Sequence, residues 1–136
     1  MGPADKMTKM ARLEAMVARL PDAQRVDIEE WGDHPTFRIN GKNFVFCDQL
    51  AEHLTVKLPK EEAAAVVATD GRAELAGYGL GRHGWVSLHL DGPVADADWQ
   101  QVEEWVRTSY TLVAPRKLAR LVMEEDERGP LGRNSG

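Results

Sequence analysis

The sequence predicts a single soluble α+β domain in two layers, with an antiparallel sheet and the helices on one face of it. A length of 136 residues suits one domain, and 43% hydrophobic with 29% charged residues is an ordinary globular balance. The spacing of apolar residues changes along the chain, which indicates the order helix, strands, helix, strands, helix. Strands that follow one another in runs favour antiparallel pairing with helices gathered on one side.

The first helix is expected within residues 7–20, after an N-terminal tail of residues 1–6. Apolar side chains recur there at steps of three and four, which places them on one stripe of a helix. They are Met7, Met10, Leu13, Met16, Val17 and Leu20. Pro21 ends the pattern, because proline lacks the N–H that a helix interior needs.

Between Val26 and Leu58 the apolar residues alternate with polar ones, which indicates strands. Asn40-Gly41 is a strong two-residue hairpin turn, so segments 36–39 and 42–47 are expected to pair. We expect three antiparallel strands in this region.

The second half of the chain begins with a helix that Pro59 can start and Gly71 can end. A strictly alternating strand is expected at 85–90, and the next helix, capped by Asp96 or Asp98, continues to Val113. A short final helix ends near residue 122. The domain therefore spans residues 7–122, and residues 123–136 are expected to be a disordered tail.

In a two-layer fold, one parity of each strand packs on the helices and the other stays open. The apolar parity expected against the helices comprises Val26, Ile28, Leu54, Val56, Leu58, Val86, Leu88 and Leu90. The open parity then carries Asp27, Glu29, Trp31, Arg38, Thr55, Lys57, Trp85, Ser87 and His89. Two tryptophans on a wet face indicate an interaction face of Trp31, Trp85 and His89, unless a loop, a helix or a dimer partner covers them.

No motif for catalysis or metal binding is present. Ser87, Ser109 and Cys47 are candidate nucleophiles, but none stands in a known triad pattern. Cys47 lies in an apolar run and is expected to be buried. The single cysteine and the spacing of the four histidines match no zinc motif, so we expect no metal, no cofactor and no enzyme activity.

The glycine-rich stretch Gly77–Gly84 matches neither phosphate-binding glycine template, and it precedes a strand instead of a helix. We expect a flexible connection between strands. A small-molecule site at this loop is the alternative.

The net charge is −5 and the isoelectric point is about 5.4. Attraction of the whole molecule to nucleic acid is not expected, although a local basic patch is compatible with this charge. The chain has no apolar run of membrane length and no signal-peptide pattern, and a single cysteine suits a reducing compartment. A cytoplasmic location is therefore expected.

Several segments together resemble the MmcQ/YjbR-like family. They are Trp31-Gly32, Thr36-Phe37-Arg38-Ile39, Gly41-Lys42-Asn43-Phe44, Leu54-Thr55-Val56-Lys57, Arg82 to Leu88, and Ser109 to Leu118. The resemblance covers about residues 7–122 and implies an α-β(3)-α-β(2)-α domain, similar to CyaY and to type III secretion chaperones. Members of the family are commonly labelled DNA-binding proteins. The family has no established catalytic residues that could be assigned to positions of this sequence. The aromatic and basic positions of the family match Lys42, Trp85, Tyr110 and Lys117.

The leading hypothesis is a non-enzymatic binding domain for DNA. Lysine and arginine would contact phosphates, and Trp85 would stack on a base. The candidate residues are Arg38, Lys42, Lys57, Arg82, His83, Trp85, Arg116 and Lys117. The alternatives are a dimeric protein-interaction or chaperone-like module that uses the open face, and the small-molecule site named above.

Overall fold

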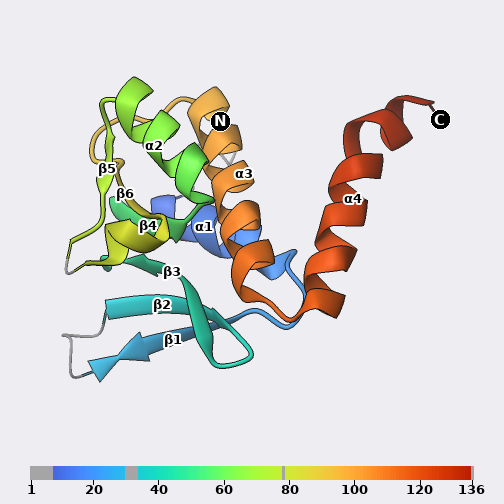
Figure 1. The fold of residues 1–136 in the computed structure, drawn as a ribbon, viewed down its shortest axis with the longest axis horizontal. Coiled ribbons are helices and arrows are strands. Elements are labelled where there is room, and N and C mark those ends of the chain that lie inside the picture. The colour runs from blue at the N-terminus through green and yellow to red at the C-terminus, as the bar shows by residue number, and fades with distance from the viewer. Residues whose placement is uncertain (1–7, 30–33, 78, 136) are drawn as a thin grey trace.

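The computed structural model describes residues 8–29, 34–77 and 79–135, with side chains described as far as Glu125. The elements in chain order are α1 (Lys9–Ala18), β1 (Gln24–Ile28), β2 (His34–Ile39), β3 (Lys42–Cys47), β4 (His53–Lys57), α2 (Lys60–Thr69), β5 (Ala73–Leu75), the 3-10 helix η3 (Leu80–His83), β6 (Trp85–His89), α3 (Asp96–Val113) and α4 (Arg116–Ser135). Figure 1 shows this arrangement.

The strands form one antiparallel sheet in the order β1-β2-β3-β4-β6-β5. This confirms the predicted α+β class. One strand prediction is wrong. Four strands precede α2 instead of three, because residues 24–28 pair with β2 as a separate edge strand. The two strands that the family resemblance implies after α2 are β5 and β6, although the three-residue β5 is too short for alternation to give its bounds.

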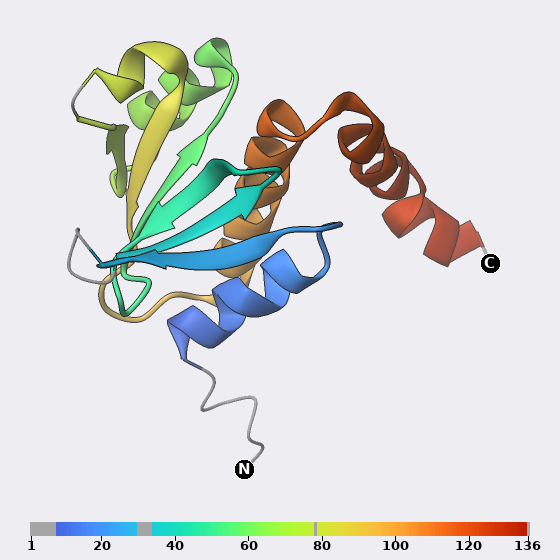
Figure 2. The same cartoon turned by 90° about the horizontal axis from the view of Figure 1, so that it is seen from below.

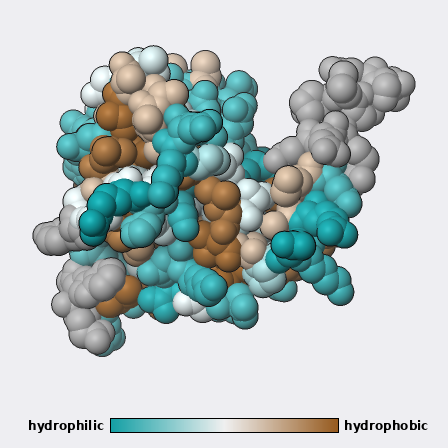
Figure 3. Space-filling view, in the orientation of Figure 1, coloured by the Kyte–Doolittle hydropathy of each residue, from teal (hydrophilic) through white to brown (hydrophobic). Residues whose placement is uncertain are grey.

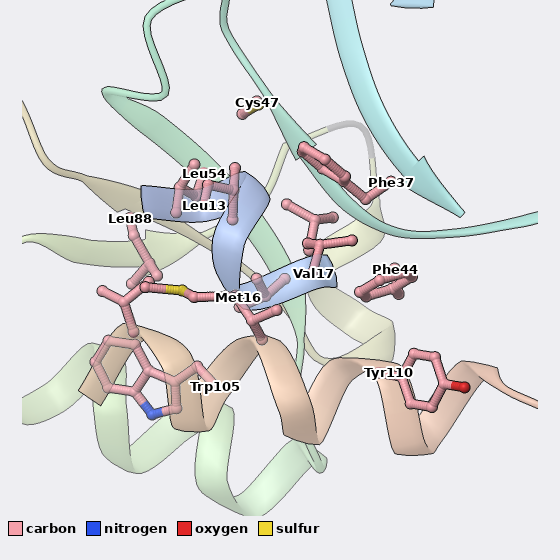
Figure 4. Close-up of a cluster of buried hydrophobic side chains, with 14 of the residues drawn as sticks. Leu13, Met16, Val17, Phe37, Phe44, Cys47, Leu54, Leu88, Trp105 and Tyr110 are labelled. Atoms are coloured by element: carbon pink, nitrogen blue, oxygen red, sulfur yellow. The ribbon is translucent and has the colours of Figure 1, made fainter. Parts of the chain in front are cut away.

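The core lies between the sheet and the helices α1, α2 and α3. The close-up in Figure 4 shows Leu13 and Met16 of α1 and Trp105 of α3 packed toward the strands. α2 packs against β5 and β6, and α3 packs against β3 and β4. One face of the sheet is thereby covered, as the apolar parity of the strands predicts.

The final helix is longer than predicted, since α4 continues to Ser135 where a tail was expected from residue 123. The run from Met123 to Arg128 consists mostly of good helix formers, and Arg107 Nη2 lies 2.7 Å from Glu125 Oε1. Figures 1 and 2 both show the end of α4 apart from the rest of the fold. The predicted N-terminal tail lies outside the described residues.

A β-bulge follows the β2–β3 hairpin. Asn40 and Gly41 both have positive φ (54° and 79°), as the predicted tight turn requires. The register then steps from Arg38–Asn43 to Phe37–Val45, which makes Phe44 the extra residue. Phe44 and Val45 are therefore both in the core, and Asn43 turns to the open face.

The edge strand β1 has the opposite parity from the one predicted. Val26 pairs with Thr36, which places it on the open face, together with Ile28. Asp27 lies on the helix side, because Arg25 binds both Asp27 (2.8 Å) and Glu14 of α1 (2.7 Å). Alternation identifies two faces of a strand, but at a sheet edge the charged side can face the helix layer when a partner is present there.

Candidate functional site: the open face of the sheet

The open face of the sheet carries most of the residues that the sequence singled out. The register places on it Val26, Thr36, Arg38, Phe46, Thr55, Lys57, Trp85, Ser87 and His89. Asn43, opposite Arg38, joins them through the bulge. Glu29 is exposed beyond the end of β1, and Trp31 lies outside the described residues.

One end of this sheet is basic. β2 ends at the hairpin, and β3 begins there. The end of β4 and the start of β6 lie at the same end of the sheet, because Val45 pairs with Val56 and Lys57 pairs with Trp85. The cations there are Arg38, Lys42, Lys57, Lys60 and Arg82, which we call the basic end. Lys60 is not among the candidates from the sequence, because its position after Pro59 predicts only the start of a helix.

No cation of the basic end forms an ion pair within the described part of the chain. Among the described residues, Arg38 donates to the Thr36 hydroxyl, at 3.3 Å. Other cations behave differently, since Lys9, Arg12, Arg19, Arg25, Arg72 and Arg107 each contact a carboxylate. These paired cations lie in or next to α1, in β1, in α3 and in the turn before β5, whereas the cations of the basic end keep their charge.

The remaining basic candidates are not all part of this end. His83 is exposed in η3, next to Arg82. Arg116 and Lys117 are exposed at the start of α4. This helix follows α3, which packs on the covered side of β3 and β4. His83 thus lies beside Arg82 of the basic end, and Arg116 and Lys117 lie on another element.

The opposite end of the open face carries histidines and carboxylates. His89 is hydrogen-bonded through Nε2 to Glu74, and the rings of His53 and His89 meet edge to face at 5.0 Å. His53 Nδ1 lies 3.9 Å from Asp48 Oδ2. Within the described residues, no group of three or more His, Cys, Asp or Glu side chains is placed to hold a metal ion. Trp85 and His89 of the predicted interaction face thus lie at opposite ends.

Trp85 is half-buried because Phe46 packs against it, with ring centroids 5.2 Å apart. Lys57 is its direct partner across the β4–β6 ladder. An aromatic pair bordered by unpaired cations is an arrangement that suits a ring attached to an anion.

An open pocket of about 840 Å³ lies beside this pair, within the range of roughly 300–1,000 Å³ of small-molecule sites. Its floor includes Thr36, Asn43, Phe46, Thr55 and Ser87, and Ala76, Gly77 and Leu80 form one wall. The predicted loop site and the open face thus meet here. Within the described part of this loop, residues 80–83 form η3 and Gly84 is buried.

Two candidate nucleophiles, Ser109 and Ser87, form hydrogen bonds within the fold. Ser109 is fully buried, where its hydroxyl donates to the Phe44 carbonyl oxygen (2.6 Å) and accepts from the Lys57 amide (2.8 Å). The Ser87 hydroxyl lies 3.2 Å from that of Thr55. Tyr110, matched by the family resemblance, is also buried, and burial raises its pKa. Its phenol donates to the Pro21 carbonyl oxygen at 2.6 Å.

Cys47 is 4% exposed, and burial raises the pKa of its thiol to about 12. At pH 8 only about one thiol in ten thousand is then ionised. We expect an aromatic disulfide reagent to label the native protein at least about a hundredfold more slowly than the urea-unfolded chain. A native labelling rate equal to that of the unfolded chain would contradict the burial of this thiol.

From the side seen in Figure 1, hydrophilic residues cover most of the surface, interrupted by apolar patches (Figure 3). Across the described residues, no helix has the length and hydropathy required to cross a bilayer.

An antiparallel sheet backed by helices, with an open face of cations, aromatic rings and a pocket, defines a small α+β domain with an open polar surface. The chain belongs to the YjbR family, whose model matches residues 18–112. The fold is similar to the crystal structure of the Deinococcus radiodurans protein DR2400, of domain DUF419, with 20% identity and a TM-score of 0.65 over 85% of this chain and 88% of that one. A search of curated proteins found no match. The predicted family and fold are thereby confirmed.

Proposed function

We propose that this YjbR-family domain is a non-enzymatic binding domain that holds single-stranded DNA across the basic end of its open face. The observation that carries the proposal is the set of five cations that have no carboxylate partner within the described residues, at the end of the sheet where Lys57 pairs with Trp85. Phosphates are bound by such cations, and an aromatic ring stacks on an unpaired base. A duplex hides the base faces, so a single strand is the better fit.

The net charge of −5 is compatible with this proposal. Exposed charges are screened beyond about 8 Å at physiological salt, so a phosphate senses mainly its near neighbours. Many carboxylates of this chain are engaged elsewhere, such as Glu14, Glu103 and Asp70 in ion pairs with arginine. A bound strand must avoid Asp22, which borders Arg38 in a surface hollow, and the exposed Glu61 and Glu62, which follow Lys60 in the first turn of α2.

The absence of enzyme activity is part of the same proposal. Ser109 and Cys47 are buried, and the partner of the Ser87 hydroxyl is Thr55 instead of a histidine. These surroundings favour binding over nucleophilic catalysis.

The test is a salt titration of affinity for a labelled oligothymidine. We expect binding at ~50 mM salt that weakens as salt rises, with a slope of about −0.7 for each phosphate neutralised. The double variant Lys57→Gln/Arg82→Gln should reduce the slope by about 1.4, because two phosphate contacts are lost. A duplex of equal length should bind more weakly.

The matched control is Lys9→Gln/Arg12→Gln, which removes the same charge from cations that are ion-paired to Glu52 and Asp96. It should leave the slope almost unchanged. Equal losses in both double variants would mean that only net charge matters, and no binding at ~50 mM salt would reject the proposal.

A further inference from the structure

The pocket beside Phe46 differs in chemistry from the basic end. Its described lining contains no lysine, arginine, aspartate or glutamate, and its one titratable side chain is His34. The Nδ1 atom of His34 is already within 3.2 Å of the Cys47 carbonyl oxygen. The pocket therefore suits an uncharged group.

Asn43 lines this pocket, and its side-chain oxygen has neither a hydrogen-bond partner in the described structure nor exposed surface, so the amide must rotate to turn this oxygen toward a ligand. Buried polar atoms are nearly always paired, so an orphan acceptor at the wall of a pocket calls for a donor from a ligand. The β-bulge at Phe44 aims this side chain into the pocket, and bulges are common where a chain re-aims a binding residue.

The Thr55 and Ser87 hydroxyls lie 3.2 Å apart on the pocket floor. One hydroxyl proton is used between them, which leaves the other proton for an acceptor. Phe46 adds a flat apolar surface beside these groups. The floor thus offers one acceptor, one donor and a ring face.

We infer that this pocket binds a planar, uncharged heterocycle with an N–H beside a carbonyl group, the edge that nucleobases such as uracil present. Once the Asn43 amide rotates toward the pocket, the ligand N–H donates to Asn43 Oδ1. The ligand carbonyl oxygen accepts from the Thr55–Ser87 pair, and the ligand ring lies on Phe46. This inference does not depend on the proposed DNA binding, because the pocket contacts use no cation of the basic end.

The first experiment titrates uridine, and separately N3-methyluridine, into ¹⁵N-labelled protein and follows the amide resonances of Asn43, Thr55 and Ser87. A ligand of this size should bind with a Kd of about 0.1–1 mM. N3-methyluridine lacks the N–H, so it should bind about tenfold more weakly or worse. Equal binding of the two nucleosides, or no shifts with uridine, would overturn the inference.

The second experiment compares Asn43→Leu with Gln101→Leu, an exposed carboxamide on α3. Asn43→Leu removes the orphan acceptor, so it should lose uridine binding while melting at the same or a higher temperature than wild type. Gln101→Leu should bind uridine as wild type does. Wild-type uridine affinity in Asn43→Leu would overturn the inference.

The third experiment separates a free nucleoside from a base within a strand. Uridine affinity should be unaffected by salt and by Lys57→Gln/Arg82→Gln. If uridine and oligothymidine compete for wild type, the pocket accepts a base of a strand; without competition, it accepts the free nucleoside. Uridine binding that weakens with salt like strand binding would overturn the pocket assignment. Loss of strand binding alone would reject only the proposed function.

Discussion

Gly84→Ala is expected to destabilise the domain by about 3 kcal/mol or more. Gly84 has a φ of +92°, which an L-residue adopts only with strain. A Cβ atom there would also lie 2.1 Å from the Leu58 carbonyl oxygen, which is backbone and cannot move aside cheaply. The same approach forms the Leu58 N to Gly84 O hydrogen bond of 2.9 Å.

The measurement is the free energy of unfolding from a urea titration. Gly71→Ala is the matched control, because Gly71 has no positive φ and a methyl group added there would have no neighbouring atom within 4 Å. It should be neutral or stabilising by up to about 1 kcal/mol. A Gly84→Ala protein within about 0.5 kcal/mol of wild type would show that β4 and η3 do not meet this closely.

Gly84 also matters for the site, since it precedes Trp85 at the start of β6. Its close approach to Leu58 brings Trp85 opposite Lys57. The glycine at this position therefore serves backbone packing, which aligns the aromatic ring with the basic end.

Ser109→Ala is expected to cost about 3 kcal/mol, because it leaves two buried backbone groups without partners. The bulge at Phe44 interrupts the β3–β4 ladder beyond the Val45–Val56 pair. The Ser109 hydroxyl bridges the gap by binding the Phe44 carbonyl oxygen and the Lys57 amide. The Ser109 side chain of α3 thereby pairs two backbone groups that the β3–β4 ladder leaves without a strand partner.

Urea unfolding of Ser109→Ala is compared with that of Thr111→Ala, which lies on the same helix. The Thr111 hydroxyl donates to the Thr108 carbonyl oxygen within the helix, so its loss should cost less than about 1 kcal/mol. Similar losses in the two variants would mean that the bridge adds nothing beyond an ordinary helix hydroxyl. A loss confined to Ser109→Ala would support the repair of the ladder.

Local patterns predicted much of this fold because they depend on neighbours in the chain. Asn40-Gly41 specified the hairpin turn, and the alternation in residues 54–58 and 85–90 specified two central strands whose apolar side faces the helices. The local pattern is weakest at two strands. β5 is too short, at three residues, for alternation to give its bounds, and β1 is an edge strand whose face depends on the Arg25–Glu14 ion pair.

The site was predictable only in part. Lysine and arginine could be named from the sequence, but whether each had a carboxylate partner depended on segments far away in the chain. Asn43 was not predicted as a site residue because alternation from Phe46 would turn it toward the core, and one extra residue at Phe44 reverses that direction. The glycine pattern was the available signal near the pocket, but Gly84 turned out to be required by packing.

The sequence by itself determined the α+β class, the family, the hairpin and the apolar face of the central strands, since these follow from periodicity, turn chemistry and the order of the family's segments. The tertiary structure alone decided which cations remain without partners, where Asn43 points and how the loop wall meets Phe46. These features arise from contacts between strands and helices that are distant in sequence, and a single inserted residue or ion pair changes them without altering the pattern that specifies the fold.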